Sequence, residues 1–481
     1  MSVEMPEVQA TNTSAVDAPP GADRAVEALR ARVRGRVIVP GDADYDAART
    51  IMYGGFDPRP AVIVRVADAA DVPAVIAVAR ESGLELAVRS GGHSNAGHST
   101  VAGGIVLDVR DLRDLEIDVD GRTAWAGAGL TAGDVSTALA EHDLAVGFGD
   151  TGSVGIGGIT LGGGVGYLVR KHGLTIDNLL AVELVTADGE IRIVDATDEP
   201  DLFWAVRGGG GNFGVATRFR FLLHELRGIV GGLLVLPATA DTVAGFIAAA
   251  DAAPDELSTI ANVMNCPPLP FVPEDVHGRV VIFSMLAWSG DPVRADAALA
   301  PFRRLATPFA DLMAPSPYTA MFPPEDDSYH PTAAARTMFM DRVGVDEARL
   351  IVDRLTASDA SLRAVQLRVL GGAMARVPAD ATAFAHRASR IMVNVAAFYE
   401  GEPDRPGRTR WVEQLAADLL QDDAGAYVNF LADEGPERVR AAYPGRTWDR
   451  LAAMKARYDP DNLFRRNQNV PPAAAPGAAS S

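Results

Sequence analysis

Two glycine-rich segments, 88–97 and 152–166, contain the residues of this 481-residue chain that are best suited to hold an anionic ligand. Glycine has no Cβ, so successive backbone N–H groups can turn toward one anion and bind a pyrophosphate without a lysine. The first segment also contains His93, and imidazole is a neutral nucleophile near pH 7. Both segments could therefore hold phosphate, whereas tight turns or close packing of a strand on a helix would explain either segment alone equally well.

A third glycine cluster, 209–214, matches the dinucleotide-binding pattern G-x-G-x-x-G. That pattern requires a strand before the glycines and a helix after them. Here the order is reversed, because residues 201–206 have helical spacing and residues 215–222 alternate like a strand. The chain also has no G-x-x-x-x-G-K-[ST] loop. The sequence therefore disfavours a nicotinamide site and gives no support to a P-loop enzyme.

Short strands and helices must position these segments. Periodicity predicts strands at 61–66, 84–89, 104–109, 122–126, 181–186 and 191–194, and helices at 24–34 and 68–82. From about residue 228 the chain is alanine-rich, with strands expected at 280–286 and 367–370 and a helix at 346–357. The pattern indicates an α+β protein whose second domain begins near residue 228.

Composition excludes several classes of function. Lys and Arg total 44 against 63 for Asp and Glu, and the resulting charge of −19 would repel nucleic acid. Cys266 is the single cysteine, so the chain cannot form an internal disulfide or a cysteine-cluster zinc site. We expect the protein to belong to a reducing compartment and to have no metal site.

The two ends of the sequence lack the signals of targeting or packing. Residues 1–23 contain no apolar run and no basic start, and residues 471–481 are rich in Pro, Ala and Ser. We interpret both as disordered tails. No stretch approaches the roughly 18 consecutive apolar residues of a membrane span. The sequence thus predicts a cytoplasmic protein with no membrane partner.

Six segments, taken in order, resemble the FAD-linked oxidases of the berberine-bridge-enzyme-like family, which have the vanillyl-alcohol-oxidase or PCMH-type FAD-binding fold. They are residues 89–94, 155–158, 161–164, 171–178, 201–215 and 457–471. The resemblance implies two α+β domains: an FAD-binding domain at 24–226 and a substrate domain of sheet and helices at 227–440. Residues 441–470 would return to the FAD-binding domain.

The resemblance also implies how FAD is held. A ring nitrogen of His93 would be bonded to the 8α-methyl carbon of the flavin. Many relatives have a second link through a cysteine, but Thr151 occupies that position here, so we expect a single link. Val154 matches the position at which valine leaves room for O2. The implied cofactor-binding residues are Arg89, Ser90, Gly91, Gly92, His93, Ser94, Gly97, His98, Thr151, Ser153, Val154, Gly155, Gly157, Gly158, Leu161, Gly162, Gly163, Gly164, Gly214, Val215, Tyr427, Asn429, Asn467 and Asn469.

A catalytic base is implied by the Tyr427-Val-Asn429 segment, which resembles the family's Y-x-N motif. A phenol with a pKa near 10 needs a cation or a strong hydrogen-bond donor beside it to act as a base at neutral pH. Relatives often have a second tyrosine in the glycine loop, but Val165 stands there in this chain. Asp380 and His386, near another family motif, are the reserve candidates.

The implied activity is an FAD-dependent oxidase. It would remove a hydride from a carbon next to an O–H or N–H group of a small organic substrate, and O2 would take the electrons to give H2O2. Two alternatives stay open: a covalent flavin dehydrogenase with another acceptor, and a flavin or small-molecule carrier without turnover. The sequence specifies neither the substrate nor the oligomeric state.

Overall fold

The computed structural model describes residues 20–324, 326 and 328–474. Most of the expected tails, 1–23 and 471–481, lie outside these residues. The first helix, α1 (Ala22–Arg32), begins inside the segment that we expected to be disordered. The strands and helices predicted from periodicity are all present, with bounds that differ by a few residues.

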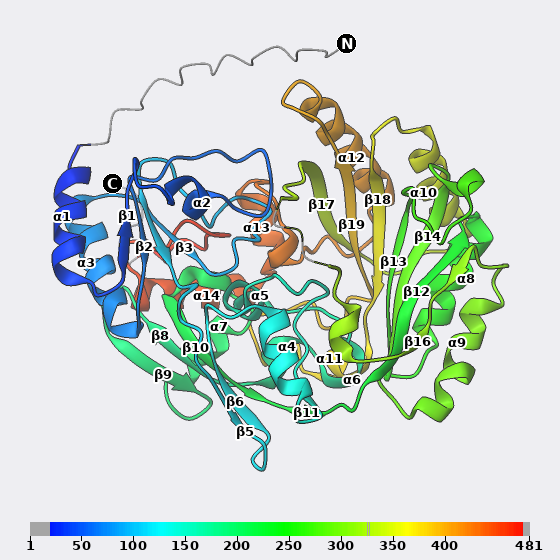
Figure 1. Ribbon diagram of the computed structural model, residues 1–481, viewed down its shortest axis with the longest axis horizontal. Helices are drawn as coiled ribbons and strands as arrows, with labels where there is room; N and C mark the ends of the chain where they lie inside the picture. Colours follow the sequence, from blue (N-terminus) through cyan, green and yellow to red (C-terminus); the bar gives the residue numbers. More distant parts are fainter. Residues whose placement is uncertain (1–19, 325, 327, 475–481) are drawn as a thin grey trace, which may run out of the picture.

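The first half of the chain forms two sheets, on the left of Figure 1. The smaller sheet has the order β1-β2-β4-β3, in which β2, β3 and β4 are parallel. Its strands are β1 (Arg36–Ile38), β2 (Val62–Arg65), β3 (Leu86–Arg89) and β4 (Ile105–Asp108). The second sheet is antiparallel, with the order β5-β6-β10-β8-β9. Its strands are β5 (Leu115–Asp118), β6 (Thr123–Gly127), β8 (Leu179–Val185), β9 (Ile191–Asp195) and β10 (Val215–Leu222).

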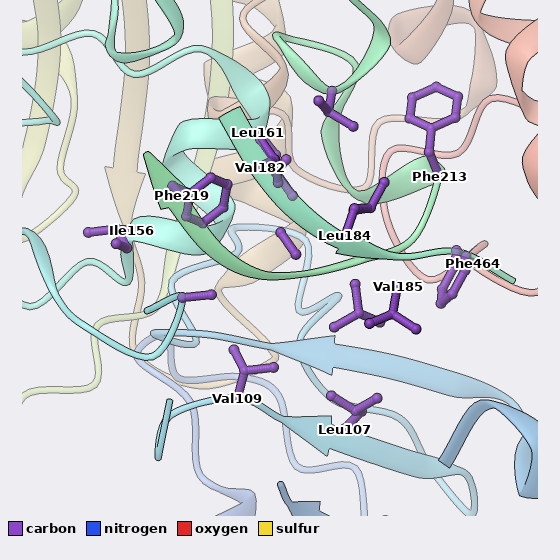
Figure 2. Packing of buried hydrophobic residues seen from close by; sticks show 14 of the residues in the cluster. Leu107, Val109, Ile156, Leu161, Val182, Leu184, Val185, Phe213, Phe219 and Phe464 are labelled. Carbon is purple, nitrogen blue, oxygen red and sulfur yellow. The ribbon is translucent and has the colours of Figure 1, made fainter. Parts of the chain in front are cut away.

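One hydrophobic core joins these two sheets. Figure 2 shows Leu107 of β4, and Val109 just after that strand, on the side of the cluster opposite Val185 of the larger sheet. Phe213 and Phe464, which are far apart in sequence, close the end of the same cluster. Residues that follow β3 and β4 are therefore held firmly against the second sheet.

Short helices connect these strands. Helix α3 (Val72–Ser82) buries one apolar face and ends at Gly83, whose φ of 69° suits glycine. The other helices of this half are α2 (Tyr45–Arg49), α4 (Ala132–Ala140), α5 (Ile156–Gly162), α6 (Val169–His172) and α7 (Pro200–Val206). A two-stranded ribbon pairs β7 (Leu144–Ala145) with β11 (His224–Glu225). The domain division proposed at residue 227 falls between β11 and the next strand.

An eight-stranded antiparallel sheet occupies the right side of Figure 1. Its strands are β12 (Ile229–Pro237), β13 (Leu257–Asn265), β14 (Val280–Trp288), β15 (Ala310–Asp311), β16 (Ala314–Ser316), β17 (Ala333–Met340), β18 (Arg363–Val369) and β19 (Ile391–Phe398). Four helices cover its outer face: α8 (Ala240–Asp251), α9 (Ala295–Arg303), α10 (Val345–Ala357) and α12 (Arg405–Leu419). Strands β18 and β19, next to the edge strand β17, present polar side chains from the opposite face toward the first half of the chain.

The end of the described chain returns to the first half. After α11 (Gly372–Arg376) and α13 (Pro436–Ala442), helix α14 (Arg446–Tyr458) packs against α7, where Arg450 lies 3.9 Å over the Trp204 ring. Residues 459–470 then pass beside Asn212, whose side-chain oxygen accepts a hydrogen bond of 2.9 Å from the backbone N–H of Val470. The half of the molecule that contains the first two sheets is thus completed by a segment from much later in the described chain.

Candidate active site

A cavity of about 450 Å³ lies where the two halves of the molecule meet. Its walls come from the loops after β3 and β7, from helix α5, from strands β18 and β19, and from residues 464–468 of the returning segment. The sequence-predicted residues that line it are Ser90, Gly91, Gly92, His93, Ser94, His98, Thr151, Val154, Gly155, Gly157, Gly158, Leu161, Gly214, Tyr427, Asn429 and Asn467.

The two glycine-rich segments touch each other at the cavity wall. A Cβ on Gly91 would stand 2.2 Å from the nitrogen of Gly155, so only glycine permits this approach. Ser90 links the segments, because its hydroxyl donates to the Ala128 carbonyl at 2.7 Å and accepts the Gly157 N–H at 3.3 Å. The structure therefore brings together two loops that the sequence suggested separately as anion-binding loops.

Arg89 supports the first loop from behind. Its guanidinium is 1% exposed and donates to the backbone carbonyls of Ala48, Arg49 (3.0 Å) and Ser99 (3.1 Å). It does not line the cavity. Its hydrogen bonds hold the backbone beneath the loop, and its expected contact with the cofactor stays a prediction.

His93 lines the cavity with a neutral ring at pH 7. Burial lowers its pKa from 6.5 to about 4, against a small opposing effect from the backbone of Ser153. A neutral imidazole keeps a nitrogen lone pair available for bond formation. The environment therefore suits the nucleophilic role expected from the sequence.

Tyr427 occupies the other side of the cavity. Its hydroxyl oxygen accepts the N–H of Gly164 and the side-chain N–H of Asn429, each at 2.9 Å. Asn429 also donates to the Ile159 carbonyl at 3.1 Å, which fixes its amide. Burial raises the pKa of Tyr427, and the two donors oppose that rise. The cavity thus holds a phenol whose oxygen accepts two hydrogen bonds, the contacts that stabilise its deprotonated form.

Empty space beside several glycines fits a large flat cofactor. A Cβ on Gly158 would meet nothing within 4 Å, and a Cβ on Gly211 would reach Asn467 only at 4.0 Å. Among the described residues, the buried side-chain oxygen of Asn467 has no hydrogen-bond partner. Free backbone edges and an unpaired acceptor are what a dinucleotide with a phosphate bridge requires. The residues present therefore fit FAD.

Several sequence-predicted residues lie outside the cavity wall. They are Arg89, Gly97, Ser153, Gly162, Gly163, Gly164, Val215 and Asn469. Val215 is buried in the core at the start of β10, and Gly97 packs against Phe56. Gly162 allows Asn429 to approach, since a Cβ there would stand 1.9 Å from the Asn429 oxygen. These residues lie outside the cavity lining, and their expected contacts with the cofactor stay predictions.

The two reserve bases, Asp380 and His386, lie away from the cavity. Asp380 is exposed at the surface, where its backbone carbonyl accepts the Trp204 indole N–H at 2.9 Å. His386 is buried behind Phe384, and its Nε2 is bonded to the Ala442 carbonyl at 3.0 Å. Neither side chain reaches the cavity. Resemblance to a local motif had suggested both, and the fold directs them elsewhere.

Polar residues of the large sheet form the wall that sequence reasoning missed. Gln366, Arg368 and Asn394 line the cavity, with Asp150 and Tyr53 from the first half. Strand register places Gln366 directly opposite Asn394. A signal was present, because each is an isolated polar residue that alternates with apolar ones in a strand.

Comparisons with known proteins agree with this architecture. A family model described as FAD binding domain matches residues 60–195, and one described as Berberine and berberine like matches residues 426–471. The chain is 32% identical over 458 residues to (R)-6-hydroxynicotine oxidase of Paenarthrobacter nicotinovorans, covering 92% of this chain and 97% of that protein. The chain belongs to the berberine-bridge-enzyme-like family. As a member of that family it is an FAD-dependent oxidoreductase.

Further comparisons agree with this assignment. An uncharacterised FAD-linked oxidoreductase of Bacillus subtilis is 32% identical, covering 92% of this chain and 99% of that protein. The crystal structure of 6-hydroxy-D-nicotine oxidase from Arthrobacter nicotinovorans has a TM-score of 0.82 and 29% identity, covering 92% of this chain and 98% of that one. A chitooligosaccharide oxidase at 22% identity shares the fold, with a TM-score of 0.81 and coverage of 94% and 100%. Within the described ranges no helix is long and apolar enough to span a bilayer.

Proposed function

We propose that the protein is an oxidase that removes two electrons and a hydrogen from a carbon next to an O–H or N–H group of a small organic substrate, and that O2 takes the electrons. The observation that carries the proposal is the Tyr427 hydroxyl, held by two donors in the cavity that His93 lines. The cavity therefore combines a proton acceptor with a site for a redox cofactor.

The residues that would hold FAD are the two glycine-rich loops and His93. When bound, FAD supplies a two-electron acceptor, which no side chain of the protein can provide. His93 would form a single covalent link, because the position of the expected second link is Thr151, which has no thiol. The loops would contribute backbone N–H groups, and Asn467 would offer its free carbonyl oxygen.

Tyr427 would accept the proton from the substrate O–H or N–H. Two N–H groups point at its oxygen and stabilise negative charge there, as donors do at any developing oxyanion. Because burial still raises the pKa of Tyr427, the base form gains population as pH rises toward the alkaline range. Asn429 would orient the phenol and remain uncharged.

The choice of oxidase over dehydrogenase rests on Val154. It lines the cavity, and its family counterpart leaves room for O2 when it is valine. A covalent dehydrogenase is the second candidate. A carrier without turnover is the third, favoured by Val165 at the place of the second tyrosine.

The covalent link is tested on a denaturing gel. The purified protein and its His93→Ala variant are denatured in acid, and flavin fluorescence is recorded in the protein band. We expect a fluorescent band that is lost in the variant and retained in the control His98→Ala, whose ring also lines the cavity. A dark parent band, or fluorescence that survives in His93→Ala, contradicts the link.

The electron acceptor is tested without knowing the substrate. The protein is reduced with dithionite without air and mixed with air-saturated buffer, while visible flavin absorbance and H2O2 are followed. Rapid return of absorbance with peroxide supports an oxidase, and Val154→Ile should slow the return. Reoxidation by dichlorophenolindophenol but not by O2 would establish the dehydrogenase instead.

A further inference from the structure

Arg368 on β18 connects both halves of the molecule inside the cavity. It is 4% exposed, and each of its three guanidinium nitrogens donates a hydrogen bond. Nε donates to the side chain of Gln366 at 2.9 Å, Nη1 to the Val165 carbonyl at 3.1 Å, and Nη2 to the Asp150 carboxylate at 2.6 Å. The cation is therefore held in one position relative to the cavity.

That position is beside Tyr427. Val165 follows Gly164, whose N–H donates to the Tyr427 oxygen at 2.9 Å, so the hydrogen bond from Arg368 holds the turn that carries this donor. The guanidinium carbon also lies 5.1 Å over the ring of Phe430, in the same short helical turn as the second donor to Tyr427. Arg368 thus contacts both segments that donate hydrogen bonds to the Tyr427 oxygen.

Asp150 provides the opposite charge in this arrangement. Its side chain is 28% exposed, lines the cavity and is paired with Arg368. The titratable groups around it are the phenols of Tyr53, Tyr167 and Tyr318. Burial, reinforced by the charge of Asp150, raises the pKa of all three, to about 12 for Tyr53. These phenols stay neutral over the range in which enzymes work.

Of the other ionisable groups near Tyr427, His386 is neutral and the charge of Arg387 is balanced by an ion pair. Burial lowers the pKa of His386, so that ring is neutral at pH 7. Arg387 is paired with Asp177 through two bonds of 2.7 Å. Arg368 is therefore the cation that acts on Tyr427 among the described residues, and its attraction for negative charge opposes the effect of burial.

We propose that Arg368 and Asp150 act as a positioning pair for Tyr427, in which Arg368 stabilises the deprotonated phenol and Asp150 fixes Arg368 while offsetting part of its charge. The inference rests on the proposed function, because it concerns the residue assigned there as the base. It follows from Coulomb's law that the two partners act in opposite directions. Removing the cation must make Tyr427 harder to deprotonate, and removing the carboxylate must make it easier.

The test reads the ionisation of Tyr427 directly. FAD-loaded protein is labelled with tyrosine carrying ¹³C at the ring carbon that bears the hydroxyl, and NMR spectra are recorded from pH 7 to alkaline pH. The resonance absent in Tyr427→Phe identifies the residue. We expect its titration to move up by about one pH unit in Arg368→Met and down by a similar amount in Asp150→Asn. Arg368→Lys, which retains the charge, should stay closer to the parent.

Controls separate this inference from the proposed function. Asp251→Asn removes a carboxylate paired with Arg390 at the surface and should leave the Tyr427 titration unchanged. Retained visible flavin absorbance shows that each variant is folded, and the isosteric Asp150→Asn keeps the test usable if Arg368→Met does not fold. A Tyr427 titration in Asp150→Asn that is identical to the parent's, or an Arg368→Met titration that does not move up, overturns the pair, whereas the flavin link and O2 reactivity are judged by their own experiments.

Discussion

Gly91 and Gly158 both line the cavity, but they are glycine for different reasons. At Gly91 a Cβ would collide with the backbone of Gly155, so the contact between the two loops depends on the missing side chain. At Gly158 a Cβ would meet only open space. Gly91 is needed for the two loops to meet, and Gly158 leaves space in the cavity that a side chain would otherwise occupy.

Gly158→Leu should therefore fold but lose the cofactor. Placing a side chain where a ligand must fit costs about 1–3 kcal/mol, so the fraction of purified chains carrying FAD should fall by about tenfold. The ratio of flavin to protein absorbance measures this fraction. Gly407→Leu is the matched control, because Gly407 in α12 also has nothing within 4 Å and lies far from the cavity. Full FAD content in Gly158→Leu would show that the space beside α5 is not the cofactor site.

At the scale of elements, helix α14 is attached to the cofactor half by a buried ion pair. Lys455 and Asp459 are fully buried, and the Lys455 ammonium donates to Asp459 at 2.7 Å and to the carbonyls of Asn212 and Phe464 at 2.8 Å. Asp459 in turn accepts the N–H of Phe464 at 2.8 Å. These bonds hold the returning segment against η3 (Gly210–Asn212) at the cavity wall.

Lys455→Met should destabilise the protein strongly. Removing one member of a buried pair leaves an uncompensated charge, which costs about 3–5 kcal/mol. The free energy of unfolding, measured in urea by circular dichroism, should fall by that amount. Arg457→Met on the same helix removes an exposed contact to Glu199 and a contact of 4.9 Å with the Tyr458 ring, and it should cost about 1 kcal/mol or less. Equal losses in the two variants would contradict the role assigned to the buried pair.

The sequence predicted those parts of the site that are local in the chain. The loops around His93 and Gly155 could be recognised because backbone close to an anion requires glycine at fixed spacing. The pairing of Asp150 with Arg368 spans 218 residues, and no local pattern shows which strands will meet. Asp380 and His386 were misplaced for the same reason, since proximity to a motif in sequence does not fix where a side chain points.

At the scale of the whole molecule, buried ionic contacts cross between the halves. Arg387 of the second half makes two hydrogen bonds of 2.7 Å to Asp177 of the first, and Arg368 of the second half pairs with Asp150 of the first.

Several buried histidines make the stability of the protein depend on pH. Burial lowers the pKa of His98 to about 4 and that of His172 to about 3.

The protein should lose stability as pH falls below about 6.5. In that range the unfolded chain binds protons on these histidines at their ordinary pKa, while the folded protein binds them only near pH 4 or below. The stability present above pH 6.5 is thus lost progressively toward pH 4. Urea midpoints at pH 7.5 and pH 5 measure the loss. His172→Gln should reduce the drop by about 1 kcal/mol, and a midpoint that is the same at both pH values would contradict the mechanism.

The return of residues 459–470 to the cavity has a consequence for biosynthesis. A ribosome makes the loops around His93 and Gly155 long before the part of the cavity wall that contains Phe464 and Asn467. The segment that forms the large sheet must therefore be synthesised before the first half of the molecule can be completed. The cavity can therefore close around a flavin only after residues 459–470 have been synthesised. A premature stop near residue 440 should leave the large sheet intact and the cavity open on the side that Phe464 and Asn467 line.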